Sequence, residues 1–513
     1  MTDRGASLSE ETTLRELARA ILDHAGSRAQ YADLLVEQVT KVEVNLLSSG
    51  ETRASAYSGK AAMQVRLVGE QGRHLEVSLG LGDFEALKPD LDAALTLLEL
   101  VEPDPDYGLA PVPDAGQTRY GRAPERDPRD GEVDAVGDLL GIIDEVRALG
   151  DEVVAARGDA GGTLKLVPEV WAYTLVEEKL IADSEGLIRT QVLPTTFVQV
   201  LTRALRGERI AQTRVRFGDI LGLESFLVPG EGLADEHRES VRAWINRAVD
   251  LLSARPLSGD ELQRLTHIVL APSAMVFLHE AQGHNFEADL IREKASGLFD
   301  PEGRPVIDPL GASSVDLFDG PPCDAGGREI PDRGFGTQFI DDEGVPLRRV
   351  QLVREGRIAG RLHNRETAHH FGEAPTGHGY SELGSPRVVR MTNTYVFPAD
   401  RSQWHADLAA LIDGIPHGAL LEGSLGGAVS KDGMSTSIQY GRRIENGELT
   451  DDVLSPANLS VKTVGALDRI EGFAGEPVVD GLGFCGKEGQ SKPVTDGGVY
   501  LRIALSDAIT LGY

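Results

Sequence analysis

The sequence predicts an α+β protein, with an N-terminal α+β domain followed by a β-rich, barrel-like C-terminal domain. Two patterns support this fold class: helical and alternating segments are mixed in the first half, whereas the second half is rich in glycine and hairpin signals. A chain of 513 residues is also too long for one small core, so two domains are expected. We place them at residues 1–255 and 256–513.

The N-terminal domain is expected to begin with a helix, an antiparallel meander and a second helix. Apolar residues recur at helical spacing over residues 10–24, and another helix is expected at about 89–101. Between them, polar and apolar residues alternate with the period of a strand. The alternating segments are residues 31–38, 41–47, 62–68 and 75–79.

A stretch rich in Pro, Gly and Asp at residues 102–131 has no periodicity and is interpreted as a linker or an extended crossover. Helices are expected on either side of the next group of strands, at about 133–156 and 236–253. The strand-like runs between them are residues 171–177, 179–183, 187–192, 195–204 and 209–216.

The C-terminal domain opens with a buried strand at residues 267–271 and a helix that Pro272-Ser273 can start. Beyond about residue 330 the chain is glycine-rich and strand-like, with hairpin signals at residues 354–356 and 445–447. This half is therefore expected to be a β-rich, barrel-like body that carries the helix.

The bulk composition excludes several classes of function. The net charge of −30 argues against nucleic acid and anionic membranes as partners, because both require a basic surface. The N-terminus lacks the basic and apolar regions of a signal peptide, and no apolar run reaches the length of about 18 residues that predicts a membrane span. A cytoplasmic location is expected. Two cysteines, Cys323 and Cys485, cannot form a disulfide framework.

The helix after Pro272 runs into the segment His279-Glu280-Ala281-Gln282-Gly283-His284, which has the pattern HExxxH. Two imidazoles can hold a divalent metal, and the carboxylate between them can act as a general base. On a regular helix, residues five apart lie roughly 140° apart around the axis. The two histidines can therefore share a metal only if the helix is widened or broken, and Gly283 would tolerate a π-type bulge.

Cys485 is the preferred third ligand, since it lies in a glycine-dense loop and a thiolate with two imidazoles is a known catalytic zinc set. Glu287 and Asp289, which follow the motif, are the alternatives. In the contrasting structural interpretation, His279 is a hydrogen-bonded core histidine and Cys485 an incidental buried residue. The sequence contains no Walker loop, no dinucleotide fingerprint in a strand–helix context and no G-x-S-x-G motif.

Several ordered motifs resemble the TldD/PmbA metallopeptidase family over nearly the whole chain, most strongly after residue 265. The weaker family features are YADLLVE (31–37) and ADSEGL (182–187). The stronger motifs are LHEAQGHNFEAD (278–289), IDDEGVP (340–346), PRVVRMTNTYVFP (386–398), IENGELT (444–450) and GFCGKEGQSKPV (483–494).

The resemblance implies a metal held by His279, His284 and Cys485, with Glu280 as the catalytic base acting on a metal-bound water. It also implies dimers that enclose a chamber, cleavage of short or unfolded peptides, including leader segments, and a homodimer or a heterodimer with a PmbA/TldE-like subunit. Because the chain keeps HExxxH, it is similar to the active, TldD-type subunit. It departs from the family at Gly377-His378-Gly379, where an asparagine usually lies between the glycines.

The sequence thus predicts a metal-dependent peptidase with one Zn²⁺ per chain, although Fe²⁺ or Co²⁺ would also suit the ligands. Two other hypotheses are an amide hydrolase that acts on a small natural product and a non-catalytic metal-binding subunit of a peptidase complex. The substrate-binding residues are not identified by the pattern. His378, Arg390 and Asn393, which lie in or beside the motifs, are candidates.

Overall fold

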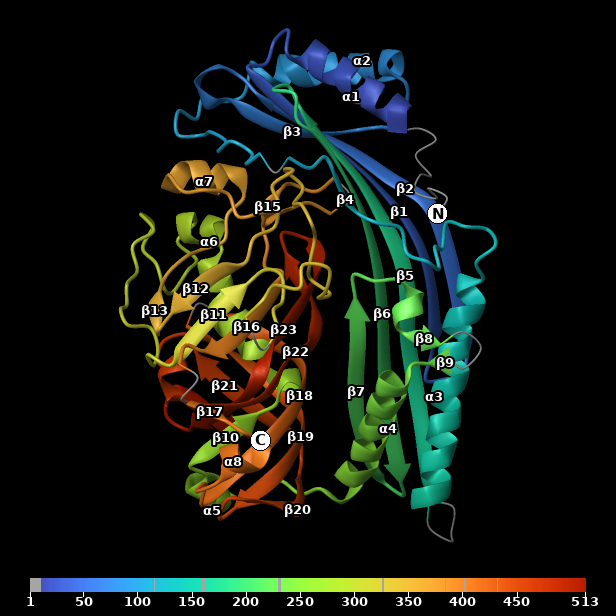
Figure 1. Cartoon of the computed structure of the whole chain (residues 1–513), viewed down its shortest axis with the longest axis vertical. Helices are drawn as coiled ribbons and strands as arrows, with labels where there is room; N and C mark the ends of the chain where they lie inside the picture. Colours follow the sequence, from blue (N-terminus) through green and yellow to red (C-terminus); the bar gives the residue numbers. More distant parts are fainter. Residues whose placement is uncertain are drawn as a thin grey trace.

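The computed structural model describes residues 11–114, 116–158, 163–228, 232–324, 327–382, 384–400, 403–430 and 432–513. A sheet formed by the first half of the chain lies beside the C-terminal half, and helices α1 and α2 pack at one end (Figure 1). The mixed architecture confirms the predicted α+β fold class. Residues 1–10, which are part of the segment expected to lack a signal peptide, lie outside the described residues.

The N-terminal sheet has seven strands in the order β3-β2-β1-β5-β6-β4, with β7 paired to β6 beyond β4, on the side of β6 opposite β5. Except for the parallel pair β4–β6, neighbouring strands are antiparallel. Runs that the sequence pattern separates form single long strands. The strands are β1 (Tyr31–Leu46), β2 (Thr52–Val68), β3 (His74–Leu79), β4 (Arg119–Gly121), β5 (Leu164–Asp183), β6 (Ile188–Arg206) and β7 (Arg209–Asp219).

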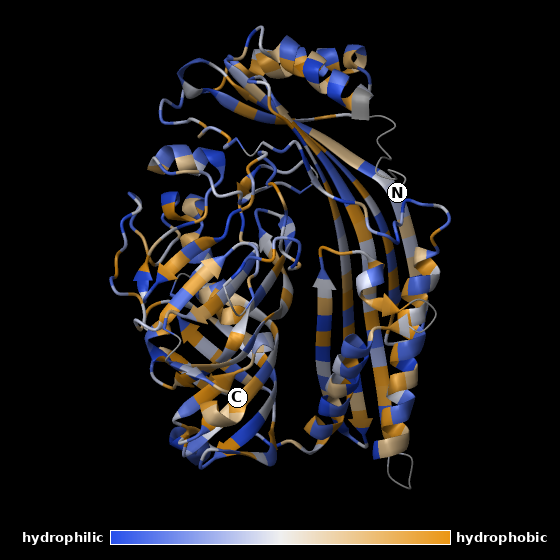
Figure 2. Ribbon diagram, viewed as in Figure 1, coloured by the Kyte–Doolittle hydropathy of each residue, from blue (hydrophilic) through white to orange (hydrophobic). Residues whose placement is uncertain are grey.

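Two pairs of helices cover this sheet. Helices α1 (Glu11–Ala25) and α2 (Phe84–Leu98) pack on one end of it, whereas α3 (Ala135–Arg157) and α4 (Asp235–Asp250) pack on the other end. Apolar and polar bands alternate along the long strands (Figure 2), as expected where only one face contacts helices. The second helix begins earlier than predicted, because Asp83 accepts a hydrogen bond from Ala86 N and caps it.

The predicted linker contains only β4 as regular secondary structure among its described residues. None of the described helices is long and apolar enough to cross a membrane.

The C-terminal half is built on a thirteen-stranded sheet, whose main path runs β13-β12-β11-β16-β23-β10-β18-β19-β21-β24. The barrel-like expectation was wrong: in the described chain the end strands β13 and β24 do not pair, so the sheet stays open. Its strands are β10 (His267–Leu270), β11 (Val315–Asp319), β12 (Val350–Arg354), β13 (Arg357–Ile358), β16 (Asn393–Pro398), β17 (Trp404–His405), β18 (His417–Ser430), β19 (Gly433–Glu445), β20 (Glu448–Leu454), β21 (Ala457–Lys462), β22 (Ile470–Lys487), β23 (Gln490–Ala504) and β24 (Ile509–Gly512).

Short elements complete the chain, and the segment 275–291 is buried in the core of the C-terminal half through Phe277, Leu278 and Phe286. The short helices are α5 (Gly259–Arg264), α6 (Ala288–Arg292), α7 (Arg365–Phe371) and α8 (Leu408–Ile412), and the short strand pairs are β8 (Leu227–Val228) with β9 (Gly232–Leu233) and β14 (Gly379–Tyr380) with β15 (Val388–Val389).

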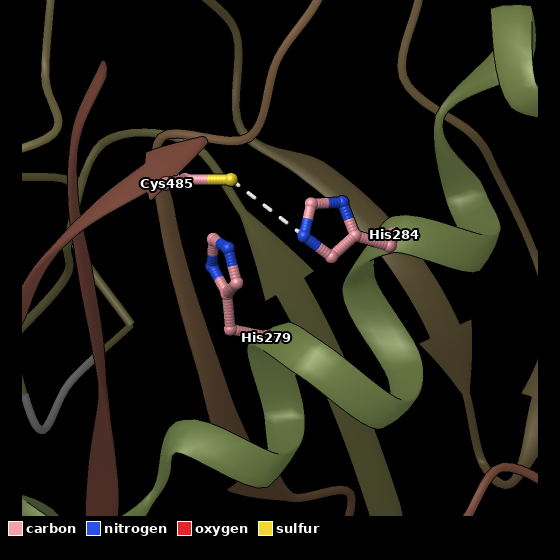
Figure 3. Close-up of side chains that lie close together, drawn as sticks. All are labelled: His279, His284 and Cys485. Carbon is pink, nitrogen blue, oxygen red and sulfur yellow. Dashed lines mark hydrogen bonds between the residues drawn. The ribbon is translucent and has the colours of Figure 1, made fainter. Parts of the chain in front are cut away.

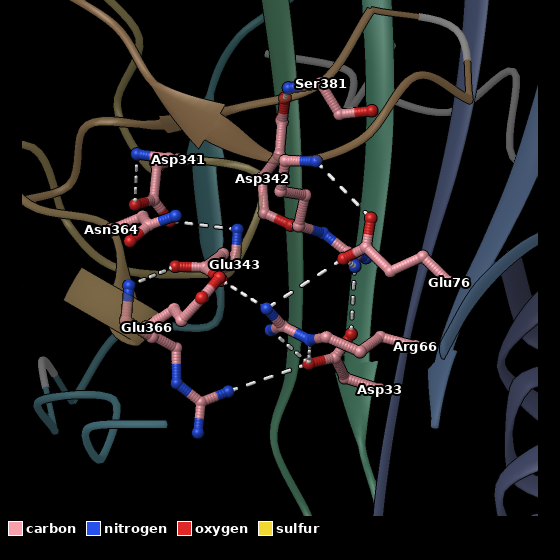
Figure 4. A network of polar contacts seen from close by, with 12 residues as sticks. Asp33, Arg66, Glu76, Asp341, Asp342, Glu343, Asn364, Glu366 and Ser381 are labelled. Atoms are coloured by element: carbon pink, nitrogen blue, oxygen red, sulfur yellow. Dashed lines mark hydrogen bonds and ion pairs between the residues drawn. The ribbon is translucent and has the colours of Figure 1, made fainter. Parts of the chain in front are cut away.

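A buried ionic network joins the two halves (Figure 4). Arg66 on β2 lies 2.5 Å from Asp33 on β1 and 2.6 Å from Glu343, which belongs to the C-terminal half. Lys179 on β5 similarly lies 2.7 Å from Asp342. Since the removal of one partner from a buried pair leaves an uncompensated charge, these contacts fix the two halves against each other. The IDDEGVP motif therefore lies at the joint between the halves.

Candidate metal centre

The HExxxH segment follows the buried strand β10 directly, but it is not a regular α-helix. A 3₁₀ turn at Pro272–Ala274 replaces the predicted helix start, and a π-helical turn covers Leu278–Gln282. A second 3₁₀ turn, Gly283–Phe286, follows at once. The wider π turn reduces the angle between residues five apart. The imidazole centroids of His279 and His284 consequently lie only 4.9 Å apart.

The π turn changes to the 3₁₀ turn at Gly283, a position where a side chain would not fit. A Cβ atom at this position would lie 2.2 Å from the Met391 sulfur and 3.3 Å from the carbonyl oxygen of Leu278. Met391, in the motif at residues 386–398, thus packs tightly against the turn between the two histidines. This contact fixes the local backbone geometry on which the histidine pair depends.

Cys485 approaches both histidines from β22 (Figure 3). One ligand atom from each of His279, His284 and Cys485 lies within 4.8 Å of the other two, and the sulfur lies 3.6 Å from His284 Nε2. Tetrahedral zinc with ordinary Zn–N and Zn–S bonds separates nitrogen and sulfur ligands by about 3.6 Å. The spacing of this pair therefore fits a shared ion.

The environment of His279 also fits a metal ligand. The side chain is buried, at 2% exposure, yet neither ring nitrogen makes a hydrogen bond among the described residues. The Asp496 carboxylate lies 3.4 Å from Nδ1. A core histidine that served only packing would be expected to satisfy its nitrogens. A buried imidazole without hydrogen bonds thus fits a residue that binds a metal ion directly.

Charge favours the thiolate form of Cys485. Burial raises the pKa of the thiol, but the neighbouring His279 and His284 outweigh this effect and lower the pKa to about 4. Burial also raises the pKa of Asp496, to about 6, although His279 opposes the shift. Since the thiolate is the form that ligates metals, Cys485 is prepared for this role at neutral pH.

The alternative ligands Glu287 and Asp289 lie behind the ligand cluster rather than within it. Glu287 is fully buried and accepts a hydrogen bond of 2.8 Å from His284 Nδ1. Asp289 accepts two bonds of 2.8 Å from Lys487, whose ammonium also lies 3.4 Å from Glu287. Burial raises the pKa of Glu287, but Lys487 and His284 lower it to about 2. Glu287 is therefore a carboxylate that orients His284, with its charge balanced by Lys487.

Glu280 faces the cavity beside the ligand cluster. The cavity has a volume of about 250 Å³ and is lined by Glu280, His279, Cys485 and Asp496, among other residues. The Glu280 carboxylate lies 3.8 Å from His284 Nε2, and its Cγ atom would lie 3.2 Å from a Cβ placed on Gly427. A base here would lie next to a metal ion held by the three clustered side chains and would be open to a ligand in the cavity.

The three substrate-binding candidates lie away from this cavity and bond within the protein. His378 contacts Asp319 at 3.2 Å, and Asn393 donates to the Gly320 carbonyl at 3.0 Å. Arg390 donates to the backbone carbonyl of Cys485, so it supports the strand that carries the thiol. None of the three is among the described residues that line the cavity.

Sequence reasoning did not find Lys487 and Asp496. Lys487 lies two residues after Cys485 on β22, so it projects from the same side of the strand as the thiol. That spacing is a signal that could have identified it. Asp496 comes from β23, and no local pattern connects it with His279.

Comparison with known proteins decides the family. Residues 263–502 match the PmbA/TldA metallopeptidase C-terminal domain. A metalloprotease from Archaeoglobus fulgidus is 34% identical over 369 residues, which are 67% of this chain and 80% of the relative. The chain belongs to the PmbA/TldD metallopeptidase family. The resemblance that the ordered motifs carry is thereby confirmed.

One further relative matches over a shorter part of the chain, and a solved structure matches nearly the whole chain at low sequence identity. A metalloprotease from Methanothermobacter thermautotrophicus is 36% identical over 259 residues, and the chain spans about half the length (52%) of that curated relative. The solved structure of TldE from Thermococcus kodakarensis shares the fold, with a TM-score of 0.70 at 15% identity over 96% of this chain and 99% of TldE. The PmbA/TldD fold is thus present along nearly the whole chain.

Proposed function

We propose that this chain is the catalytic, TldD-type subunit of a peptidase that hydrolyses short or unfolded peptides, including leader or propeptide segments. The observation that carries the proposal is the convergence of His279, His284 and Cys485 beside Glu280 in one cavity. The peptide class is taken from the family, whose relatives are named metalloproteases.

His279, His284 and Cys485 would hold one metal ion, and two imidazoles with a thiolate favour zinc over Fe²⁺ or Co²⁺. Such an ion lowers the pKa of a coordinated water and polarises the carbonyl of the scissile bond. Glu280 would then accept a proton from the attacking water and pass it to the leaving amine. The buried Glu287 would hold His284 in the orientation that presents Nε2 to the ion.

The chain would act as a homodimer or with a PmbA/TldE-like partner, and its likeness in fold to TldE supports either assembly. A role as a non-catalytic metal-binding subunit is less well supported, because Glu280 lines the cavity as a base must. Native mass measurements of the chain alone and with a TldE-like subunit would distinguish the two assemblies.

The test of the function compares zinc-loaded wild type with Glu280→Gln on unstructured peptides. We expect the variant to keep its zinc and its thermal stability but to lose about 10²- to 10⁴-fold in kcat, because the general base is absent. Glu293→Gln, which changes an exposed glutamate in the same region, is the matched control and should cleave like wild type. Normal cleavage by Glu280→Gln would contradict the assigned role of the base.

A further inference from the structure

Two arginines from the N-terminal sheet form part of the wall of the metal cavity. Arg214 and Arg216 lie on β7 and line the same cavity as His279, Glu280 and Cys485. Residues two apart on a strand project to the same face. The alternate side chains Val215 and Phe217 belong instead to the core under α3 and α4. The arginines therefore face the C-terminal half, which supplies the ligands.

Both guanidinium groups are held in place by neutral acceptors. Arg216 donates from Nε to Gln199 Oε1 at 2.8 Å and from Nη1 to the carbonyl oxygen of Leu482 at 2.9 Å. Arg214 donates from Nη2 to the carbonyl oxygen of Ser424 at 2.9 Å. Leu482 lies on β22, three residues before Cys485, so the position of Arg216 is tied to the strand that carries the thiol.

Neither arginine forms an ion pair with a carboxylate in the described part of the chain, although Arg247, nearby on α4, pairs with Glu422 at 2.8 Å. A guanidinium has five N–H donors. The hydrogen bonds above use two donors of Arg216 and one of Arg214. Both side chains thus retain donors for a further acceptor.

The lowered pKa values of both arginines agree with the lack of a paired anion among the described residues. Burial lowers the pKa of Arg216 to about 9, and the adjacent positive charge of Arg214 contributes to the shift. Burial likewise lowers the pKa of Arg214. A carboxylate between the two would offset this uncompensated positive charge, and the planar fork of each guanidinium matches its two oxygens.

We propose that Arg214 and Arg216 bind a carboxylate of the peptide substrate and so position the scissile bond beside Glu280 and the metal ligands. This inference rests on the proposed function and specifies its substrate class. The carboxylate is either the C-terminus of the peptide or an Asp or Glu side chain near the cleaved bond. The first source makes the enzyme a carboxypeptidase, whereas the second gives it a preference for acidic residues.

The experiment uses the full-length, zinc-loaded protein and one set of matched peptides. A parent peptide with a free C-terminus is compared with its C-terminal amide, and each Asp or Glu is replaced in turn by Asn or Gln. The enzymes are wild type, Arg214→Gln, Arg216→Gln and Arg209→Gln. Arg209 is an exposed arginine at the start of β7 outside the cavity, so its variant controls for the loss of a positive charge on this strand.

For wild type, removal of the recognised carboxylate should lower kcat/KM by about 10- to 100-fold, the range for hydrogen bonds to a charged group. Most of the loss should appear in KM. Arg214→Gln and Arg216→Gln should cleave the original and the neutral peptide at similar rates, whereas Arg209→Gln should discriminate like wild type. If the C-terminal amide lowers kcat/KM, the recognised carboxylate is the C-terminus of the peptide. If an Asn or Gln replacement lowers it, the carboxylate is that Asp or Glu side chain.

A binding measurement separates this inference from the proposed function. The same peptides are titrated into zinc-loaded Glu280→Gln, with and without the arginine substitutions, and thermal unfolding establishes that each variant is folded. Tighter binding of the carboxylate peptide that depends on Arg214 and Arg216 supports the inference even if wild type cleaves nothing. Equal binding and equal cleavage of charged and neutral peptides, or discrimination that persists in both arginine variants, would overturn it.

Discussion

Replacement of Glu287 by glutamine tests whether the residue behind His284 controls the metal. Glutamine keeps nearly the same shape and can still accept a hydrogen bond from His284 Nδ1, but it removes the negative charge. In the wild type this carboxylate is fully buried, and its pKa of about 2 keeps it ionised at neutral pH. The substitution therefore removes the charge that would strengthen His284 as the proposed metal ligand.

The expected magnitude follows from the geometry. The contact is a charge-assisted hydrogen bond of 2.8 Å to His284, the imidazole proposed as a ligand. Loss of such an outer partner typically weakens metal affinity by about 10- to 100-fold, or about 1.4–2.7 kcal/mol. The loss of metal affinity should not be much larger, because the Lys487 ammonium keeps its two hydrogen bonds to Asp289 and does not become an unpaired charge.

Zinc affinity is measured by competition with a chelator at neutral pH, for wild type, Glu287→Gln and the exposed control Glu293→Gln. We expect the control to match wild type. A Glu287→Gln protein that remained folded and bound zinc as tightly as wild type would refute the assignment. Complete loss of zinc would instead return Glu287 to the list of direct ligands.

The remaining predictions concern the thiol, the turn and acid stability. Zinc content should fall from about one ion per chain to well below that in Cys485→Ser, but it should be unchanged in Cys323→Ser. Gly283→Ala should lower the free energy of unfolding by about 1–3 kcal/mol through overpacking, as read from denaturant midpoints. Gly141→Ala, at a helical site with open space, should be neutral or slightly stabilising, and equal effects would contradict the steric argument. Burial alone would raise the pKa of Asp319, but hydrogen bonds from a histidine and two threonines lower it below the usual value. Its stabilisation is therefore complete above the unfolded pKa of about 4 and lost as the pH falls through the folded pKa, so unfolding free energy should drop more steeply from pH 5 to pH 3 in wild type than in Asp319→Asn.

Local chemistry was predictable from the sequence. The five-residue separation of His279 and His284 is incompatible with a regular helix that presents both to one ion, so a π-type distortion could be inferred from helix geometry alone. Cys485 could be proposed because of its donor chemistry. Its place 3.6 Å from His284 depends on the register of the β22–β23 hairpin, some two hundred residues away, and no periodicity encodes that register.

Features that depend on packing were missed. The sequence pattern separates the runs 171–177 and 179–183, yet β5 is continuous through Glu178, whose buried carboxylate pairs with Arg129 from the predicted linker at 2.7 Å. Arg214 and Arg216 occupy the polar positions of an alternating strand, which ordinarily face water. They line a cavity only because the C-terminal half covers that face, which is a property of the assembled fold.

The ionic joint between the halves has a mechanical consequence for the site. One wall of the cavity belongs to β7 in the N-terminal sheet and the opposite wall to β18 and β22. To swing these walls apart, the chain would have to separate ion pairs such as Arg66–Glu343 and Lys179–Asp342, whose four side chains are all buried. These buried pairs therefore oppose a hinge motion that would part the two walls of the cavity. On the proposed function, a substrate would therefore reach Glu280 as an extended segment of chain and not as a folded domain.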